Sequence, residues 1–139
     1  MTSIHPFFVH FPLALLTVSF LFDAAGAILH KEDLRKAGWW TMLSGYTGML
    51  VALGSGLLAA DGLDLGNGAA MVLTDHKQLA FVAAVCFTIL TFWRVASKAS
   101  VPQRYGWAFW GLYGLGIVVI WYVSWLGGTL VYVHHVGSV

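Results

Sequence analysis

The stretch HPFFVHFPLALLTVSFLFDAAGAIL, residues 5–29, decides how the rest of the chain is interpreted. Two histidines and two prolines open it, and a long apolar run with one carboxylate, Asp23, follows. An α-helix needs about 20 apolar residues to cross the hydrocarbon core of a bilayer. No Lys or Arg lies between Met1 and Pro12, so the basic segment that opens a signal peptide is absent. We therefore interpret residues 7–29 as a retained transmembrane helix.

The composition extends this interpretation to the whole chain. Of its 139 residues, 59% are hydrophobic and only 9% are charged, and the mean hydropathy is +0.79. Soluble domains carry about 25% charged residues. Three further apolar segments are long enough to span a bilayer, at residues 39–60, 76–96 and 107–133. The sequence thus predicts an all-α bundle of four transmembrane helices in one domain, residues 1–139. The net charge of +1 excludes a nucleic-acid partner.

The distribution of charge predicts the orientation of this bundle. Basic residues flank the first and third connections between helices, whereas the second connection has only Lys77 beside three aspartates. The positive-inside rule places the two basic connections in the cytoplasm. We therefore expect both termini and a loop at residues 61–75 on the outer, periplasmic side. Thr74 or Asp75 would cap the third helix.

Histidines gather at the outer ends of the predicted helices. A helix of about 20 residues is about 30 Å long, which matches the hydrocarbon core of a bilayer. Measured from the inner interface, this length ends at or near a histidine on three of the four helices. Histidine is the commonest metal ligand and an axial ligand of haem iron. For each one, an interfacial residue bonded to backbone or lipid headgroups is the alternative. The candidate ligands are His5, His10, His76, His134 and His135.

Haem b is the cofactor that this pattern favours, in one or two copies. Four-helix bundles hold cofactors between side chains on facing helices. We expect two of His10, His76 and His134 to ligate haem, with His5 as a further or alternative ligand. The pair His10 and His76 is preferred because both lie at helix starts. The alternative is a bare Zn²⁺ or Cu²⁺ ion held by three histidines, with His135 among the candidates, and a carboxylate.

The second helix carries a stripe of small residues that includes Gly45 and Gly48. Such a stripe would give a flat porphyrin a smooth wall, so we include both glycines among the cofactor-binding candidates. Close packing against a neighbouring helix is the alternative, because small residues are common at helix interfaces in membranes.

Asp23 needs a partner of its own, because an ionisable residue inside an apolar helix is costly and marks a functional candidate. Arg94 lies at a similar predicted depth near the inner end of the third helix. We therefore predict an ion pair between Asp23 and Arg94. A proton-relay role for Asp23 is the alternative.

Motifs at both ends of the chain carry a family resemblance. They are HPFFVHFPLA at residues 5–14, Asp23 in the first helix, and WLGGTLVYVH at residues 125–134. Together they resemble the DUF2231 family of bacterial, predicted four-helix inner-membrane proteins. The resemblance implies a bacterial inner-membrane location. It also marks four histidines, with Thr129 standing where the family pattern has an acidic residue. The marked histidines are His5, His10, His134 and, at the opening of the third helix, His76.

The leading functional hypothesis is a small membrane redox protein, similar to a b-type cytochrome, that transfers electrons near the outer leaflet. A bundle of this size is expected to contact lipid and to work as a homodimer or as a subunit of a respiratory or redox complex. The serines within the predicted helices, Ser19, Ser44, Ser55 and Ser124, have no histidine nearby as a nucleophile–base set would require, so an electron carrier or subunit is favoured over a stand-alone enzyme. The alternatives are an outward-facing Zn- or Cu-binding protein without haem, or a structural membrane subunit.

Overall fold

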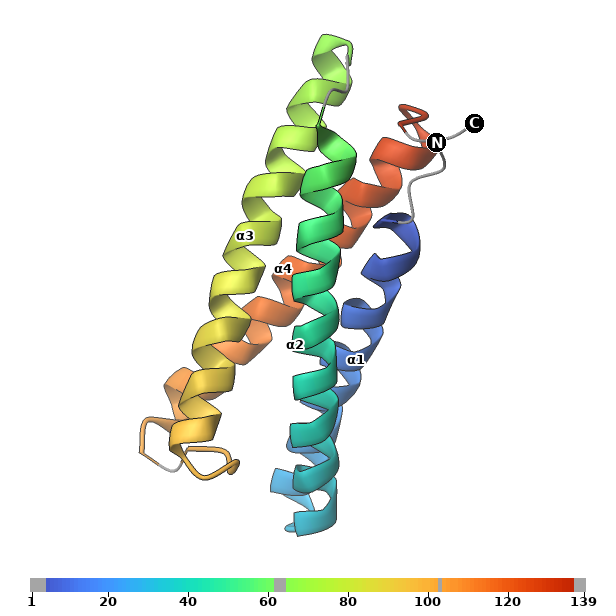
Figure 1. Cartoon of the computed structure of the whole chain (residues 1–139). Helices are drawn as coiled ribbons and strands as arrows, with labels where there is room; N and C mark the ends of the chain where they lie inside the picture. Colours follow the sequence, from blue (N-terminus) through green and yellow to red (C-terminus); the bar gives the residue numbers. More distant parts are fainter. Residues whose placement is uncertain (1–4, 62–64, 103, 137–139) are drawn as a thin grey trace.

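Four long helices make up the fold of the computed structural model, which describes residues 5–61, 65–102 and 104–136, with side chains from Val9 onward. Each helix is long and apolar enough to cross a membrane, and successive helices run in opposite directions (Figure 1). This confirms the prediction of an all-α protein with four helices that are long and apolar enough to span a membrane. The helices are α1 (His5–Ile28), α2 (Glu32–Ala60), α3 (Asn67–Ala96) and α4 (Gly106–Tyr132).

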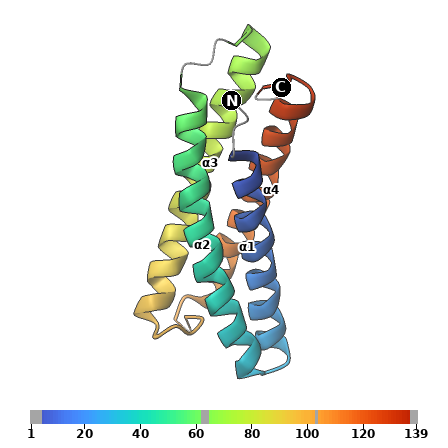
Figure 2. The ribbon, with the colours of Figure 1, turned by 45° about the vertical axis from the view of Figure 1, so that its right-hand side comes forward.

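The two ends of the bundle differ in their contents. The start of α1, the end of α4 and the connection between α2 and α3 lie at one end, which we name the terminal end (Figures 1 and 2). The α1–α2 and α3–α4 connections lie at the other, which we name the basic end because Lys31 and Lys98 are found there. Any candidate site can therefore be placed by its distance from one of these two ends.

The second and third helices begin earlier than the sequence predicts. Helix α2 begins at Glu32, and Glu32 and Asp33 place acidic charge in its first turn, where the helix dipole favours it. Helix α3 begins at Asn67, so the prediction of a loop throughout residues 61–75 is wrong. Residues 69–73, AAMVL, are mostly good helix formers and continue α3 toward the terminal end.

The predicted N-cap of α3 is wrong for the same reason. Thr74 and Asp75 lie inside the helix, and the N-cap residue is Gly66. The Thr74 hydroxyl donates to the Ala70 carbonyl one turn earlier, at 2.9 Å, so it is used within the helix and caps nothing.

Glycines on α2 let α1 approach closely. A Cβ atom on Gly45 would lie 2.8 Å from Cγ of Leu16, which is closer than packed side chains allow. A Cβ atom on Gly48 would lie 3.6 Å from Cδ of Pro12, in ordinary contact. Both glycines thus face α1. These contacts support the helix-packing interpretation of the small-residue stripe, and a porphyrin has no space at Gly45 in this arrangement.

Aromatic residues fill the centre of the bundle. Phe87, Phe109 and Tyr113 are fully buried. The Tyr113 ring meets Phe109 and Phe87 edge to face, with centroids 5.7 and 6.0 Å apart. Large apolar side chains such as Phe92, Val118 and Trp125 point outward instead. Exposed apolar surface of this extent belongs in contact with lipid chains.

Candidate functional site

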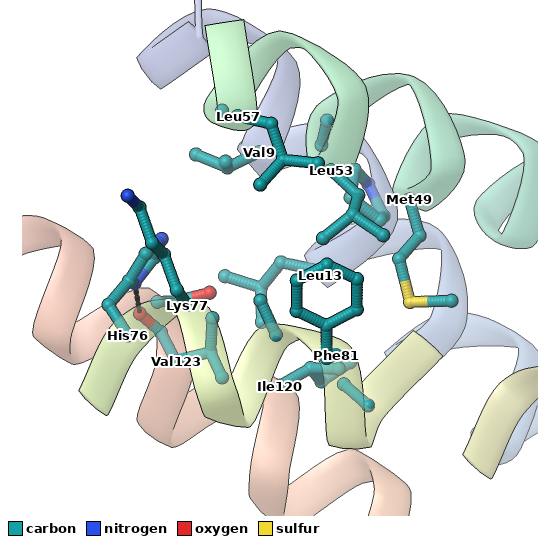
Figure 3. A pocket seen from close by; sticks show the side chains of 16 residues that line it. Val9, Leu13, Met49, Leu53, Leu57, His76, Lys77, Phe81, Ile120 and Val123 are labelled. Carbon is teal, nitrogen blue, oxygen red and sulfur yellow. Dashed lines mark hydrogen bonds between the residues drawn. The ribbon is translucent and has the colours of Figure 1, made fainter. Parts of the chain in front are cut away.

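An apolar pocket lies among the four helices, in the half of the bundle nearer the terminal end. Its volume is about 90 Å³. Its walls are mostly aliphatic, and its polar groups stand on one side, where His76 and Lys77 lie together (Figure 3). The pocket thus combines an apolar interior with a polar edge. Its lining includes Val9 and Leu13 from α1, Met49, Leu53 and Leu57 from α2, Phe81 from α3, and Ile120, Val123 and Ser124 from α4.

His76 is held in place by α4. Its Nδ1 donates a hydrogen bond to the carbonyl oxygen of Val123 at 3.0 Å (Figure 3). A carbonyl oxygen only accepts, so Nδ1 carries the proton, and in the neutral ring the lone pair is on Nε2. Gly127 makes space for the ring, since a Cβ atom there would lie 3.2 Å from Cε1 of His76. The sequence identified His76 as a candidate, and the structure gives it a fixed orientation at the pocket.

The other predicted histidine ligands do not line the pocket. His10 is exposed on α1, because Val9 and Pro12 occupy the inward face there. His134 is half-buried and lies 3.8 Å from the position of a Cβ atom on Gly68. His135 is exposed beyond the end of α4. The side chain of His5 lies outside the described part of the chain.

Among the described residues, the histidines do not gather into a group that could hold a metal ion. Within the described residues, no three His, Cys, Asp or Glu side chains lie close enough to hold a metal ion together. His10, His76, His134 and His135 alone therefore do not form the expected site of three histidines, and a site that includes His5 lies outside the described side chains. These four histidines share an end of the bundle, where His10 and His135 are exposed and His76 and His134 are half-buried.

The predicted ion pair between Asp23 and Arg94 is confirmed. Both side chains are fully buried, and the guanidinium binds the carboxylate through two parallel hydrogen bonds. One joins Nη2 to Oδ1 at 2.8 Å, and the other joins Nη1 to Oδ2. A two-pronged contact of this kind is the strongest arrangement for an arginine and a carboxylate.

The remaining donors of Arg94 are also engaged. Nη2 donates to the Arg35 carbonyl at 2.9 Å, and Nε donates to the Ala99 carbonyl at 3.3 Å. Nη1 makes a weak contact with the sulfur of Met42 at 3.8 Å. The guanidinium also lies over the Trp39 ring, 5.3 Å from its centroid. All five N–H groups of the guanidinium therefore have partners.

Ser19 and Tyr113 join the fourth helix to this centre. The Ser19 hydroxyl donates to the Gly38 carbonyl at 2.6 Å and lies 2.6 Å from the Tyr113 hydroxyl. Gly38 also faces Asp23, and a Cβ atom there would overlap the carboxylate. The sequence reasoning missed these three residues. One signal for Ser19 was available, since it precedes Asp23 by four residues and shares its helix face.

The comparison with protein families rests on the whole chain. Residues 1–139 match the family described as a predicted membrane protein, DUF2231. The chain belongs to the DUF2231 family. This confirms the resemblance carried by the two terminal motifs. No curated protein and no solved structure matches the chain. The description of DUF2231 places its members in a membrane and names no activity, so function must be argued from the pocket and its polar edge.

Breaking the buried pair on one side should destabilise the fold more than neutralising both sides. Arg94→Gln leaves a buried carboxylate without a counter-charge, and Asp23→Asn leaves a buried guanidinium. Each should lower the free energy of unfolding by about 3–5 kcal/mol. The double variant should recover part of this loss, because two neutral amides remain. Thermal unfolding of the detergent-purified variants measures the effect.

The control for the single and double variants is Glu32→Gln, which removes an exposed ion pair with Arg35 at 3.8 Å. It should change stability by no more than about 1 kcal/mol. Single variants that unfold like the wild type would show that the pair does not hold the bundle together.

Proposed function

We propose that this protein binds an amphipathic molecule of the membrane. The apolar part of that molecule occupies the pocket, and its polar group lies beside His76 and Lys77. The observation that carries this proposal is the pocket itself, with aliphatic walls and polar groups on one side only. Ligand sites in proteins combine a mostly apolar lining with a few converging polar groups in the same way.

The position of the pocket supports entry from the bilayer. Leu57 on α2 and Phe81 on α3 border it and are 45% and 47% exposed, so part of its rim lies on the lipid-facing surface. From His76 to Ala83, both in the lining, α3 rises about 10 Å. The pocket therefore runs from a polar edge toward the middle of the bundle, as an inserted hydrocarbon chain would.

Haem b is the second candidate occupant, and one observation favours it. The hydrogen bond from His76 Nδ1 to a backbone carbonyl is the kind that orients metal-ligating histidines. In this proposal His76 is an axial ligand, and His10, His134 or His5 would have to approach it. The protein would then transfer electrons as a homodimer or as a subunit of a respiratory complex. Among the described residues, His76 is the one histidine that lines the pocket, so the amphipathic molecule comes first.

A bare Zn²⁺ or Cu²⁺ ion remains the weaker alternative to haem. His76 is oriented as a metal ligand, but the described residues gather no group of three ligands around it. Protein sites for Zn²⁺ use three or four side chains. A metal site would therefore need ligands from outside the described residues or from another chain.

Filling the pocket should displace its occupant. Ala80 lines the pocket on α3, whereas Ala96 is exposed on the same helix. Ala80→Phe should lower the amount of amphiphile that co-purifies in mild detergent about tenfold, a loss of about 1.4 kcal/mol in affinity. Ala96→Phe should leave it unchanged. Extraction and mass spectrometry measure the bound molecule, and equal occupancy in both variants would overturn the proposal.

Haem binding has its own spectroscopic test. If haem is the occupant, the purified protein shows a Soret band and reduction-sensitive α and β bands, and His76→Ala removes them. His10→Ala removes them too if the expected pair of ligands forms. His30→Ala is the control, because His30 lies at the basic end. A wild-type protein without a Soret band eliminates haem and leaves the amphiphile proposal intact.

We also propose that the terminal end faces the periplasm across a bacterial inner membrane. The support is the concentration of Lys and Arg at the basic end, which the positive-inside rule places in the cytoplasm. In a Cys86→Ala background, a membrane-impermeant maleimide applied to intact cells should label Gly66→Cys, between α2 and α3. It should not label Ser100→Cys, between α3 and α4. The reverse labelling pattern would invert the orientation.

A further inference from the structure

Lys77 is a cation at an apolar pocket, and no ion-pair partner for it lies among the described residues. It is half-buried and lines the pocket beside His76 (Figure 3). The ion pairs of the described residues join Arg94 to Asp23 and Arg35 to Glu32, and none includes Lys77. An ammonium group next to hydrocarbon is costly unless it is paired or solvated. Its partner must then come from elsewhere.

The acidic residues of this end do not supply that partner. Asp75 is two residues before Lys77 on α3, so the two side chains point to different sides of the helix. Asp61 is exposed at the end of α2 and makes no ion pair with Lys77. Asp64 lies outside the described residues. Within the described chain, the polar edge of the pocket therefore carries uncompensated positive charge.

The depth of Lys77 places it among lipid phosphates. Nineteen residues separate it from Ala96, the last residue of α3, and this length of helix spans about 29 Å. The hydrocarbon core of a bilayer is about 30 Å thick. With the basic end of α3 at one interface, Lys77 reaches the opposite interface, where headgroups begin. Residues 67–75 then project beyond the hydrocarbon.

We propose that the occupant of the pocket is an anionic phospholipid. Its phosphate pairs with the Lys77 ammonium, and part of one acyl chain occupies the apolar pocket between the four helices. This inference rests on the proposed function and specifies its ligand. Charge complementarity selects an anionic headgroup, the depth of Lys77 selects an interfacial phosphate, and the lipid-facing rim lets the chain enter from the bilayer.

The test measures lipid preference in the full-length protein. The protein in a zwitterionic detergent receives an equimolar mixture of phosphatidylglycerol, phosphatidylcholine and palmitate, and native mass spectrometry counts the bound molecules. The wild type should retain phosphatidylglycerol over phosphatidylcholine about tenfold. Lys77→Gln should reduce this preference to nearly equal binding, and Lys77→Arg should keep it. Lys36→Gln, which removes a lysine at the basic end, should also keep it.

The outcomes separate the two proposals. Equal binding of both phospholipids to the wild type, or an unchanged preference in Lys77→Gln, overturns the assignment of the anionic headgroup and leaves the pocket proposal standing. If the protein retains palmitate in place of phosphatidylglycerol, the assignment of the occupant as a phospholipid is overturned. Binding of no amphiphile, or binding that Ala80→Phe does not reduce, overturns the proposed function itself.

Discussion

The buried ion pair between Asp23 and Arg94 is the contact on which the arrangement of the helices depends. Two charges removed from water repay their desolvation only when the geometry is good and every remaining donor is satisfied. Arg94 meets this condition by reaching Asp23 on α1 and the Arg35 carbonyl on α2 from its own place on α3. Ser19 and Tyr113 connect α4 to the same centre. The register of all four helices is therefore fixed by polar contacts near the basic end.

The pocket lies in the other half of the bundle. Its described lining is mostly apolar, and His76 and Lys77 form its polar edge. Small side chains line it on two facing helices, Ala52 and Gly56 on α2 and Ala80 and Ala83 on α3. Side chains this short cannot bridge the space between helices that are held apart by larger neighbours. The buried polar contacts around Asp23 and Arg94 thus hold the helices near the basic end, and an apolar space remains toward the terminal end. The polar contacts that stabilise the bundle and the proposed ligand site thus lie in different halves of the molecule.

The sequence predicted correctly those features that depend only on the position of a residue along the helix axis. Length and hydropathy predicted four spanning helices, and matching depths predicted the partner of Asp23. It failed where direction around the axis mattered. His10 and Val9 are neighbours at nearly the same depth, yet Val9 lines the pocket and His10 is exposed. Each residue turns a helix by about 100°, so counting residues gives the height of a histidine and not its facing. The sequence did not predict that α3 begins at Asn67, because the apolar residues 69–73 are compatible with a loop as well as with a helix.

Arg94 and Lys77 show how a cation that the fold pairs internally differs from one that we propose to bind a ligand. Arg94 has its carboxylate, its carbonyls and an aromatic face within the described chain, so another molecule could only compete with contacts already made. Lys77 lines the apolar pocket and has no ion-pair partner among the described residues. A charge that the fold satisfies is explained by the fold. Lys77, which has no ion-pair partner among the described residues, is the ground for the proposed anionic lipid, whose phosphate would lie at the depth of this side chain.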